Sequence, residues 1–274
     1  SGRGGEGAWQ NLACMEGWVS PKDSDKSGSP LCNKWLDHIA RCDLLASASD
    51  RAAIGRIGLP VNYDDSGIEI KHLLSGEPLQ LQLGQWHDYL MELKNRREWL
   101  SQVEEISIPE SIRQCESPRK VFWWLWRCYG EEISKALNSE RLDAKEPCLP
   151  LLPADTRIPD ASLWSHVTMT SALAGALTGY HRDDAAYPKK GARENKDYYK
   201  SRPHVAIFSF TPVQELIKAS RKMRDFWAGS WILHYLSAKV AWAIAKKYGP
   251  DTLLYPCLYQ QPLIDLWLLK EYPD

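Results

Sequence analysis

Basic residues surround a Gly-Ser pair between positions 220 and 230, and these residue types suit the binding of a phosphate group. The group consists of Ser220, Arg221, Lys222, Arg224, Asp225, Gly229 and Ser230. At the start of a helix, a Gly-Ser pair would present backbone N–H groups and a hydroxyl to a phosphate, and the basic side chains would add positive charge. In the alternative interpretation, Gly229 permits close helix packing and the basic side chains form a solvated face.

Other candidate ligands are scattered along the chain. The seven cysteines are never spaced Cys-x-x-Cys, which argues against a zinc ribbon and a disulfide framework and favours reduced thiols in a cytoplasm. The dipeptide His87-Asp88 has no second pair of ligands at a useful spacing, so we interpret it as a surface feature. Asp155 and Arg157 lie between prolines, and we favour an ordered turn held by their contact over a catalytic role.

The composition is that of a folded protein with a substantial core. The chain has 274 residues, of which 44% are hydrophobic, and its net charge of -1 provides no global attraction to nucleic acid. The most apolar stretch, residues 231–245, contains His234 and Lys239 and is too short to span a bilayer. We therefore interpret this stretch as a buried helix.

Apolar residues at helical spacing predict a mainly α-helical first part of the chain. The expected helices cover residues 33–54, 84–104, 118–138 and 162–177. The apolar face of the first is formed by Trp35, Ile39, Cys42, Leu45 and Ala46. The third is so rich in aromatic residues that we expect it to be buried on several sides. Residues 178–203 have few aliphatic side chains and predict a linker or mobile loop; their basic residues and tyrosines could contact nucleic acid, but interspersed acids favour a solvated loop.

The pattern changes after residue 203. Residues 205–210 predict a short strand, and Thr211-Pro-Val-Gln214 predicts a helix start with a capping box. Helical spacing follows, with an interruption at 228–230, and ends at Gly249-Pro250. Residues 253–255 predict a second strand. Strand, helices and strand together indicate the start of an α+β domain.

Two segments of the chain resemble a known family. The first is Leu152–Asp160 followed by Ser162–Ala174, and the second is Phe208–Gln214 leading into Ser220–Leu233. Further matching positions are Gly249-Pro-Asp251, Leu254-Tyr-Pro256 and Gln261-Pro262, with weaker similarity at Cys42–Ser47, Asp50-Arg51 and His72–Gly76. Their order and separation resemble the large subunit of the type III-B, or Cmr-type, CRISPR interference complex.

The resemblance implies a domain organisation. It suggests a circularly permuted HD-nuclease-like helical domain over 1–177, a linker over 178–203, and the beginning of a ferredoxin-like palm domain over 204–274. The family combines an HD-type single-strand DNase with a cyclic oligoadenylate synthase. This sequence has neither the family's N-terminal His-Asp pair nor a Gly-Gly-Asp-Asp motif. We therefore expect an N-terminal fragment, cut at both ends and inactive alone.

The resemblance also implies site residues and partners. Asp43 and His166 match two metal ligands of the permuted HD site, so we expect their side chains to share a cleft; in the alternative they are an ordinary solvated carboxylate and helix histidine. The group at 220–230 would face a nucleotide between two palm domains. The expected cofactors are manganese, nickel or magnesium, and ATP. Expected partners are the other Cmr-type subunits and, through the complex, CRISPR RNA and target RNA, in the cytoplasm and with no membrane.

Two other functions stay open on the sequence alone. The chain could be a non-catalytic helical scaffold that docks CRISPR RNA and neighbouring protein subunits. It could instead be an independent HD phosphohydrolase, which would need an intact His-Asp pair with further ligands.

Overall fold

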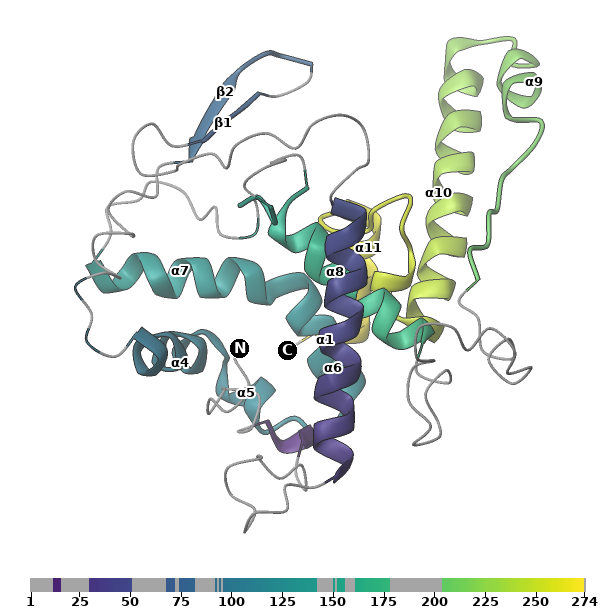
Figure 1. Cartoon of the computed structure of the whole chain (residues 1–274). Coiled ribbons are helices and arrows are strands. Elements are labelled where there is room, and N and C mark those ends of the chain that lie inside the picture. The colour runs from purple at the N-terminus through teal and green to yellow at the C-terminus, as the bar shows by residue number, and fades with distance from the viewer. Residues whose placement is uncertain are drawn as a thin grey trace. The chain divides into compact units, whose positions relative to one another are not determined.

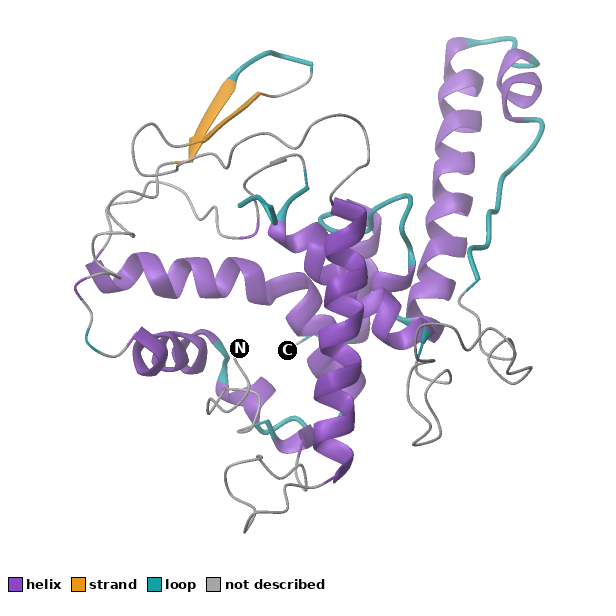
Figure 2. Ribbon diagram, viewed as in Figure 1, coloured by secondary structure: helices purple, strands orange, loops and turns teal. Residues whose placement is uncertain are grey.

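The structure is a computed structural model, and it describes residues 12–15, 30–50, 68–71, 74–81, 92, 94, 96–141, 150, 152–155, 161–177 and 204–273 (Figure 1). The chain divides into two compact units, Ser1–Ser171 and Ala172–Asp274. The described part is mainly helical, as the sequence predicts (Figure 2). Within this part, no helix combines the length and the apolar character needed to cross a membrane. The predicted linker at 178–203 and the dipeptide His87-Asp88 lie outside the described residues.

The first unit begins with a short 3-10 turn, Ala13–Met15, and the long helix α1, Pro30–Asp50. The predicted helix at 33–54 is confirmed as far as Asp50, and residues 51–54 lie outside the described residues. Over the side chains that the structure describes, its apolar face is narrower than expected. Among residues 38–48, the part of α1 whose side chains the structure describes, the buried residues lie at four-residue intervals, at His38, Cys42 and Ala46. Ile39 and Leu45 are about half exposed, because only one edge of the helix faces the core.

A β-hairpin is the element that the periodicity analysis missed. Strands β1, Ile68–Lys71, and β2, Pro78–Leu81, pair antiparallel, with Ile68 opposite Leu81 and Lys71 opposite Pro78. The signal was present in the sequence, since both strands alternate apolar and polar residues. Gly76 in the turn has φ +71°, a conformation that glycine adopts without steric cost.

Helices α4, Arg96–Ser107, and α5, Glu110–Arg113, follow the hairpin. α4 packs against the later helix α7, Gly130–Arg141, where Val103 and Ala136 are buried together. A second core cluster joins the N-terminal turn to the helices that follow it. Its buried members are Leu12, Ile108, Ile112 and Val121.

The aromatic helix predicted at 118–138 is confirmed as α6, Pro118–Trp124, continuing through a π-helical turn, Leu125–Tyr129, into α7. Ser117 caps its start, because its hydroxyl accepts a hydrogen bond from the Lys120 backbone N–H. Trp123 and Trp126 are buried and meet edge to face, with ring centroids 5.8 Å apart. The predicted burial of this helix is therefore confirmed at these two positions.

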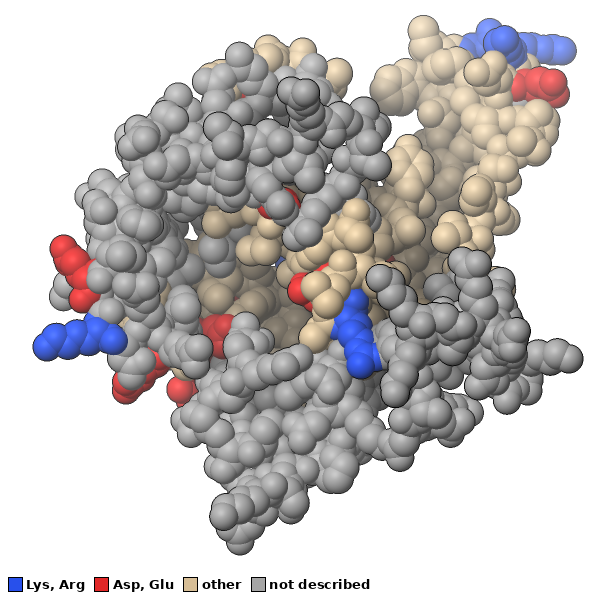
Figure 3. Space-filling view, viewed as in Figure 1, with Lys and Arg blue, Asp and Glu red and all other residues tan. Residues whose placement is uncertain are grey.

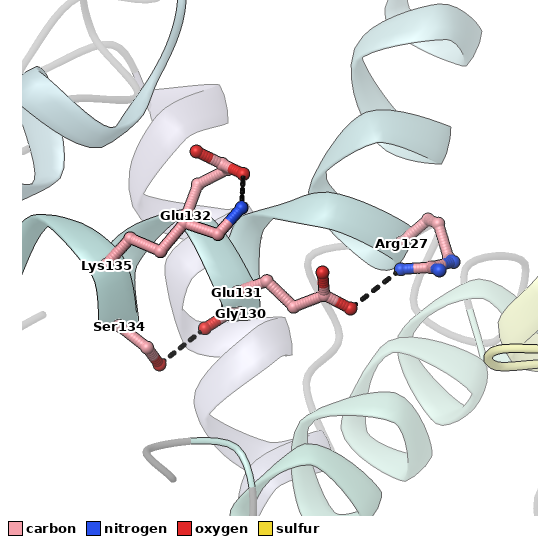
Figure 4. Close-up of polar contacts among 6 residues, drawn as sticks. All are labelled: Arg127, Gly130, Glu131, Glu132, Ser134 and Lys135. Atoms are coloured by element: carbon pink, nitrogen blue, oxygen red, sulfur yellow. Dashed lines mark hydrogen bonds and ion pairs between the residues drawn. The ribbon is translucent and has the colours of Figure 1, made fainter. Parts of the chain in front are cut away.

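One polar contact spans the junction between the π-helical turn and α7, and two more lie in the first turns of α7 (Figure 4). Arg127 forms an ion pair with Glu131 at 2.9 Å, and Lys135 pairs with Glu132 at 2.6 Å. The Ser134 hydroxyl donates to the Gly130 carbonyl at 2.7 Å. A π-helical turn disturbs the regular backbone ladder. These short side-chain contacts stabilise the start of α7, directly after the π-helical turn.

Helix α8, Leu163–Ala176, confirms the prediction for 162–177; it begins in the first unit and continues past the boundary at Ser171. Its start is fixed by a loop whose two ends pair: Ala154 N–H donates to the Ala161 carbonyl, and Leu163 N–H donates to the Leu152 carbonyl. The Ser162 hydroxyl then accepts from the Ser165 backbone N–H at 3.1 Å, as an N-cap residue does. Arg157, the predicted partner of Asp155 in this turn, lies outside the described residues.

The second unit contains helices α9, Val213–Lys218, α10, Met223–Tyr248, and α11, Pro262–Glu271, with a 3-10 turn at Pro250–Thr252. The C-terminal half of α10 packs on α11. Contacts between the two helices include the Lys246–Glu271 ion pair at 2.7 Å and the Trp242–Trp267 ring contact. As predicted, α10 ends at Gly249, whose φ is +108°.

Three predictions for the second unit are wrong. Residues 205–210 and 253–255 do not form strands, since no described segment forms a hydrogen-bonded ladder with them. The capping box at Thr211 does not form: α9 begins at Val213 with Pro212 as its N-cap residue, and no side chain caps it. The interruption at 228–230 does not occur, because α10 runs through it.

Candidate functional site

Two side chains separated by 123 positions in the sequence meet in the first unit. His166 Nε2 lies 2.8 Å from Asp43 Oδ1, within hydrogen-bond distance. Asp43 comes from α1 and His166 from α8, and these two helices cross in Figure 1. The structure therefore brings together the two residues that the sequence resemblance assigned to one site.

Asp43 is held at the edge of α1 by the burial of its neighbours. Cys42 and Ala46 are completely buried, which fixes the rotation of α1 against the core. Asp43 follows Cys42 directly, and 54% of its side chain stays exposed to solvent. Its carboxylate is thus anchored by the helix and remains accessible to a ligand from solution.

His166 is positioned by the start of α8. The Ser162 cap sets where the helix begins, and Trp164 packs on Trp126 of the π-helical turn with ring centroids 5.7 Å apart. The His166 side chain, one turn after Ser162, is only 12% exposed. A mostly buried imidazole therefore points one nitrogen at an accessible carboxylate.

An imidazole nitrogen and a carboxylate oxygen are common ligands of divalent cations. Two such atoms about 2.1 Å from one ion, as neighbouring ligands, lie roughly 3 Å from each other. The 2.8 Å separation of His166 Nε2 and Asp43 Oδ1 fits this arrangement. Protein metal sites usually have three or more protein ligands. No group of three His, Cys, Asp or Glu side chains with that geometry occurs among the described residues, so the pair supplies two ligands.

His38 and Cys42 lie on the buried edge of α1, just before Asp43, and the sequence analysis did not single out His38. Cys42 Sγ is 3.9 Å from His38 Nε2. Burial raises the pKa of the Cys42 thiol, which disfavours the thiolate that would bind a metal. The signal for this contact was the four-residue spacing of the two residues on one helix.

The predicted phosphate site at 220–230 does not have the geometry expected from the sequence. Gly229 and Ser230 lie inside α10, so their backbone N–H groups are not at a helix start. A Cβ atom on Gly229 would meet nothing within 4 Å, so close packing does not explain this glycine either. Arg221, Lys222 and Arg224 are exposed near the N-terminus of α10. The Arg224 Nε lies 3.8 Å from the neighbouring Asp225 Oδ1.

Comparisons with known proteins match this chain over part of its length. Residues 205–274 match the family model described as CRISPR-associated protein Cmr2, N-terminal. A relative from Pyrococcus furiosus, named CRISPR system Cmr subunit Cmr2, is 35% identical over 120 residues. Those residues are 44% of this chain and 11% of the relative. No solved structure matches. The two matches confirm the resemblance inferred from the sequence.

Proposed function

We propose a function for this chain from its similarity to the large subunit of the type III-B, Cmr-type CRISPR systems. In this proposal the chain is part of an RNA-guided antiviral complex, and its first unit carries part of an HD-type, metal-dependent site that cuts single-stranded DNA. The observation that supports the proposal is the 2.8 Å contact between His166 Nε2 and Asp43 Oδ1.

In this site, Asp43 and His166 would hold a divalent cation such as manganese, nickel or magnesium. Such a cation lowers the pKa of a bound water, which supplies a hydroxide nucleophile at neutral pH. Asp43 contributes negative charge from the accessible side, and His166 contributes a nitrogen that coordinates only when it carries no proton. The buried setting of the imidazole limits its rotation, so Nε2 stays directed at Asp43. A complete site would need further ligands, which the described residues do not supply.

The second unit has a separate role in this proposal. As the resemblance implies, the exposed basic residues Arg221, Lys222 and Arg224 would face a nucleotide such as ATP in the complete protein. Side chains, and not the backbone of Gly229 and Ser230, would make this contact, since those two residues lie within α10. Neighbouring Cmr-type subunits, CRISPR RNA and target RNA are the proposed partners.

A non-catalytic scaffold is the second candidate. The observation that favours it is that, among the described residues, Asp43 and His166 have no third metal ligand beside them. In a scaffold, the Asp43–His166 contact would only join α1 to α8, and the chain would serve to dock RNA and neighbouring subunits. Metal binding separates the two candidates, because only the nuclease proposal requires it.

The test is a titration of the 274-residue chain with Mn²⁺, followed by the loss of the free-ion signal in electron paramagnetic resonance. We expect weak binding that becomes about tenfold weaker or more in Asp43→Asn and in His166→Gln, a loss of at least about 1.4 kcal/mol. The matched controls Asp225→Asn and His234→Gln, both exposed on α10, should bind as the wild type does. Equal binding by all five proteins would contradict the ligand assignment. No binding by the wild-type chain would contradict the metal site and favour the scaffold.

A further inference from the structure

Aromatic side chains line one face of the N-terminal half of α10. Trp227, Trp231 and Tyr235 follow one another at four-residue intervals, so they lie above one another along the helix. We call these three residues the α10 stripe. Arg224 precedes the stripe by three positions, and Lys239 follows it by four. The face therefore has cations before and after its aromatic rings.

The C-terminal end of the stripe, at Tyr235, is packed against α11, whereas its N-terminal end, at Trp227 and Trp231, is exposed to solvent. Tyr235 packs edge-on against Trp267 of α11 at 5.8 Å, and Lys239 Nζ lies 4.4 Å from the centroid of the Trp267 ring. Trp231 stacks on Tyr235 with ring centroids 5.2 Å apart and an interplanar angle of 14°. Trp231 is still 57% exposed and Trp227 is 70% exposed. The parallel Trp231–Tyr235 pair is thus a preformed stack that solvent can reach.

The charge around the stripe is mostly positive. Asp225 is the only acidic residue within α10. The exposed basic residues before and at the start of the helix are Lys218, Arg221, Lys222 and Arg224. Figure 3 shows basic groups and an acidic group at the tip where α9 meets α10, with uncharged surface along α10 beneath it. An apolar protein surface would leave these cations without partners, whereas a polyanion would neutralise them.

We propose that the α10 stripe is a stacking platform for the unpaired bases of a single-stranded nucleic acid. Every base has a flat π-face, so exposed Trp rings bind bases with little sequence preference, while basic side chains contact the phosphates. Bases stack on Trp227 and Trp231, and the backbone phosphates contact Lys218 together with Arg221, Lys222 and Arg224, the same cations that would contact the phosphates of a nucleotide in the proposed function. This inference extends the proposed function to a second surface, far in sequence from Asp43 and His166. It rests on the proposed function for the kind of ligand.

The test measures fluorescence anisotropy of labelled 12-nucleotide single strands, oligo(U) RNA and oligo(dT) DNA, with a duplex of the same length for comparison. We expect the 274-residue chain to bind both single strands more tightly than the duplex, and to bind more weakly as salt increases. Trp227→Ala and Trp231→Ala should each weaken single-strand binding about tenfold, because one stacked base is lost. Trp231→Tyr should restore most of the affinity, which a purely structural role of the indole would not require.

The matched control is Tyr248→Ala, which removes an exposed aromatic ring at the other end of the same helix. It should leave the affinity unchanged. The proposal is overturned if the wild-type chain binds neither single strand, if the control loses as much affinity as the Trp variants, or if the duplex binds equally well. It is also overturned if sedimentation shows that the Trp residues hold two copies of the chain together without affecting oligonucleotide binding. Mn²⁺ binding without oligonucleotide binding would reject this inference alone, and the reverse result would reject the metal site alone.

Discussion

The continuity of α10 predicts that Gly229→Ala stabilises the second unit. Gly229 lies within the helix, has no positive φ, and would bring its new Cβ within 4 Å of nothing. Alanine is favoured over glycine in a helix interior by about 1 kcal/mol. With no contact to oppose this preference, we expect a gain of roughly 0.5–1 kcal/mol in the free energy of opening α10.

The same substitution at Gly249 should have the opposite effect. Gly249 ends α10 with φ +108° and ψ 145°, a region that is strained for any residue with a Cβ. We expect Gly249→Ala to cost about 1–3 kcal/mol. The two variants therefore make the same chemical change on one helix with opposite predicted signs.

Hydrogen exchange followed by mass spectrometry measures both effects locally, so the two units need not unfold together. Peptides from residues 223–248 should exchange more slowly in Gly229→Ala and faster in Gly249→Ala than in the wild type. Faster exchange in Gly229→Ala would refute the reasoning. It would mean that Gly229 does interrupt the helix, as the sequence pattern first indicated, and that its backbone N–H is available to a ligand.

Two further predictions concern burial. Ile264→Ala should lower the free energy of unfolding in urea by about 2–5 kcal/mol, since Ile264 is 1% exposed. Leu269→Ala, on the exposed side of α11, should change it by about 0.5 kcal/mol or less. Equal effects of the two substitutions would contradict the packing of α11. Iodoacetamide at pH 8 should modify exposed Cys257 well before buried Cys42, as read by peptide mass spectrometry, because burial raises the Cys42 pKa. The raised pKa also makes stability depend on pH. The stability that the protonated Cys42 thiol contributes is fully present below the pKa of this thiol in the unfolded chain, and it is lost as pH rises through the pKa in the folded chain.

The helices of the first unit could be predicted from the sequence because their signals are local. Ser117-Pro118 marks a helix start, and the helix that follows carries its aromatic residues where they can be buried. The narrow buried edge of α1 could not be predicted: over residues 38–48, His38, Cys42 and Ala46 are buried, whereas Ile39 and Leu45 are apolar yet about half exposed. How far a core reaches around a helix depends on its neighbours in space.

The errors in the second unit have a similar origin. The apolar run at 205–210 has strand-forming residues, but a strand exists only with a hydrogen-bonded partner, and propensity does not supply one. Gly229 looked like a helix boundary because glycine is a common breaker, while the apolar residues on both sides of it carry α10 through. The prediction that Asp43 and His166 lie close together came from the family resemblance, since no local sequence pattern relates positions 123 residues apart.

The most direct test of the metal site is a Mn²⁺ titration observed by NMR at the imidazoles of the seven histidines. Bound Mn²⁺ broadens the signals of nuclei close to it. We predict that the His166 signal broadens first, at Mn²⁺ concentrations that leave exposed His204 and His234 unaffected, and that Asp43→Asn removes this selectivity. Simultaneous broadening of His166, His204 and His234, or unchanged selectivity in Asp43→Asn, would contradict the assignment of Asp43 and His166 as ligands of one cation.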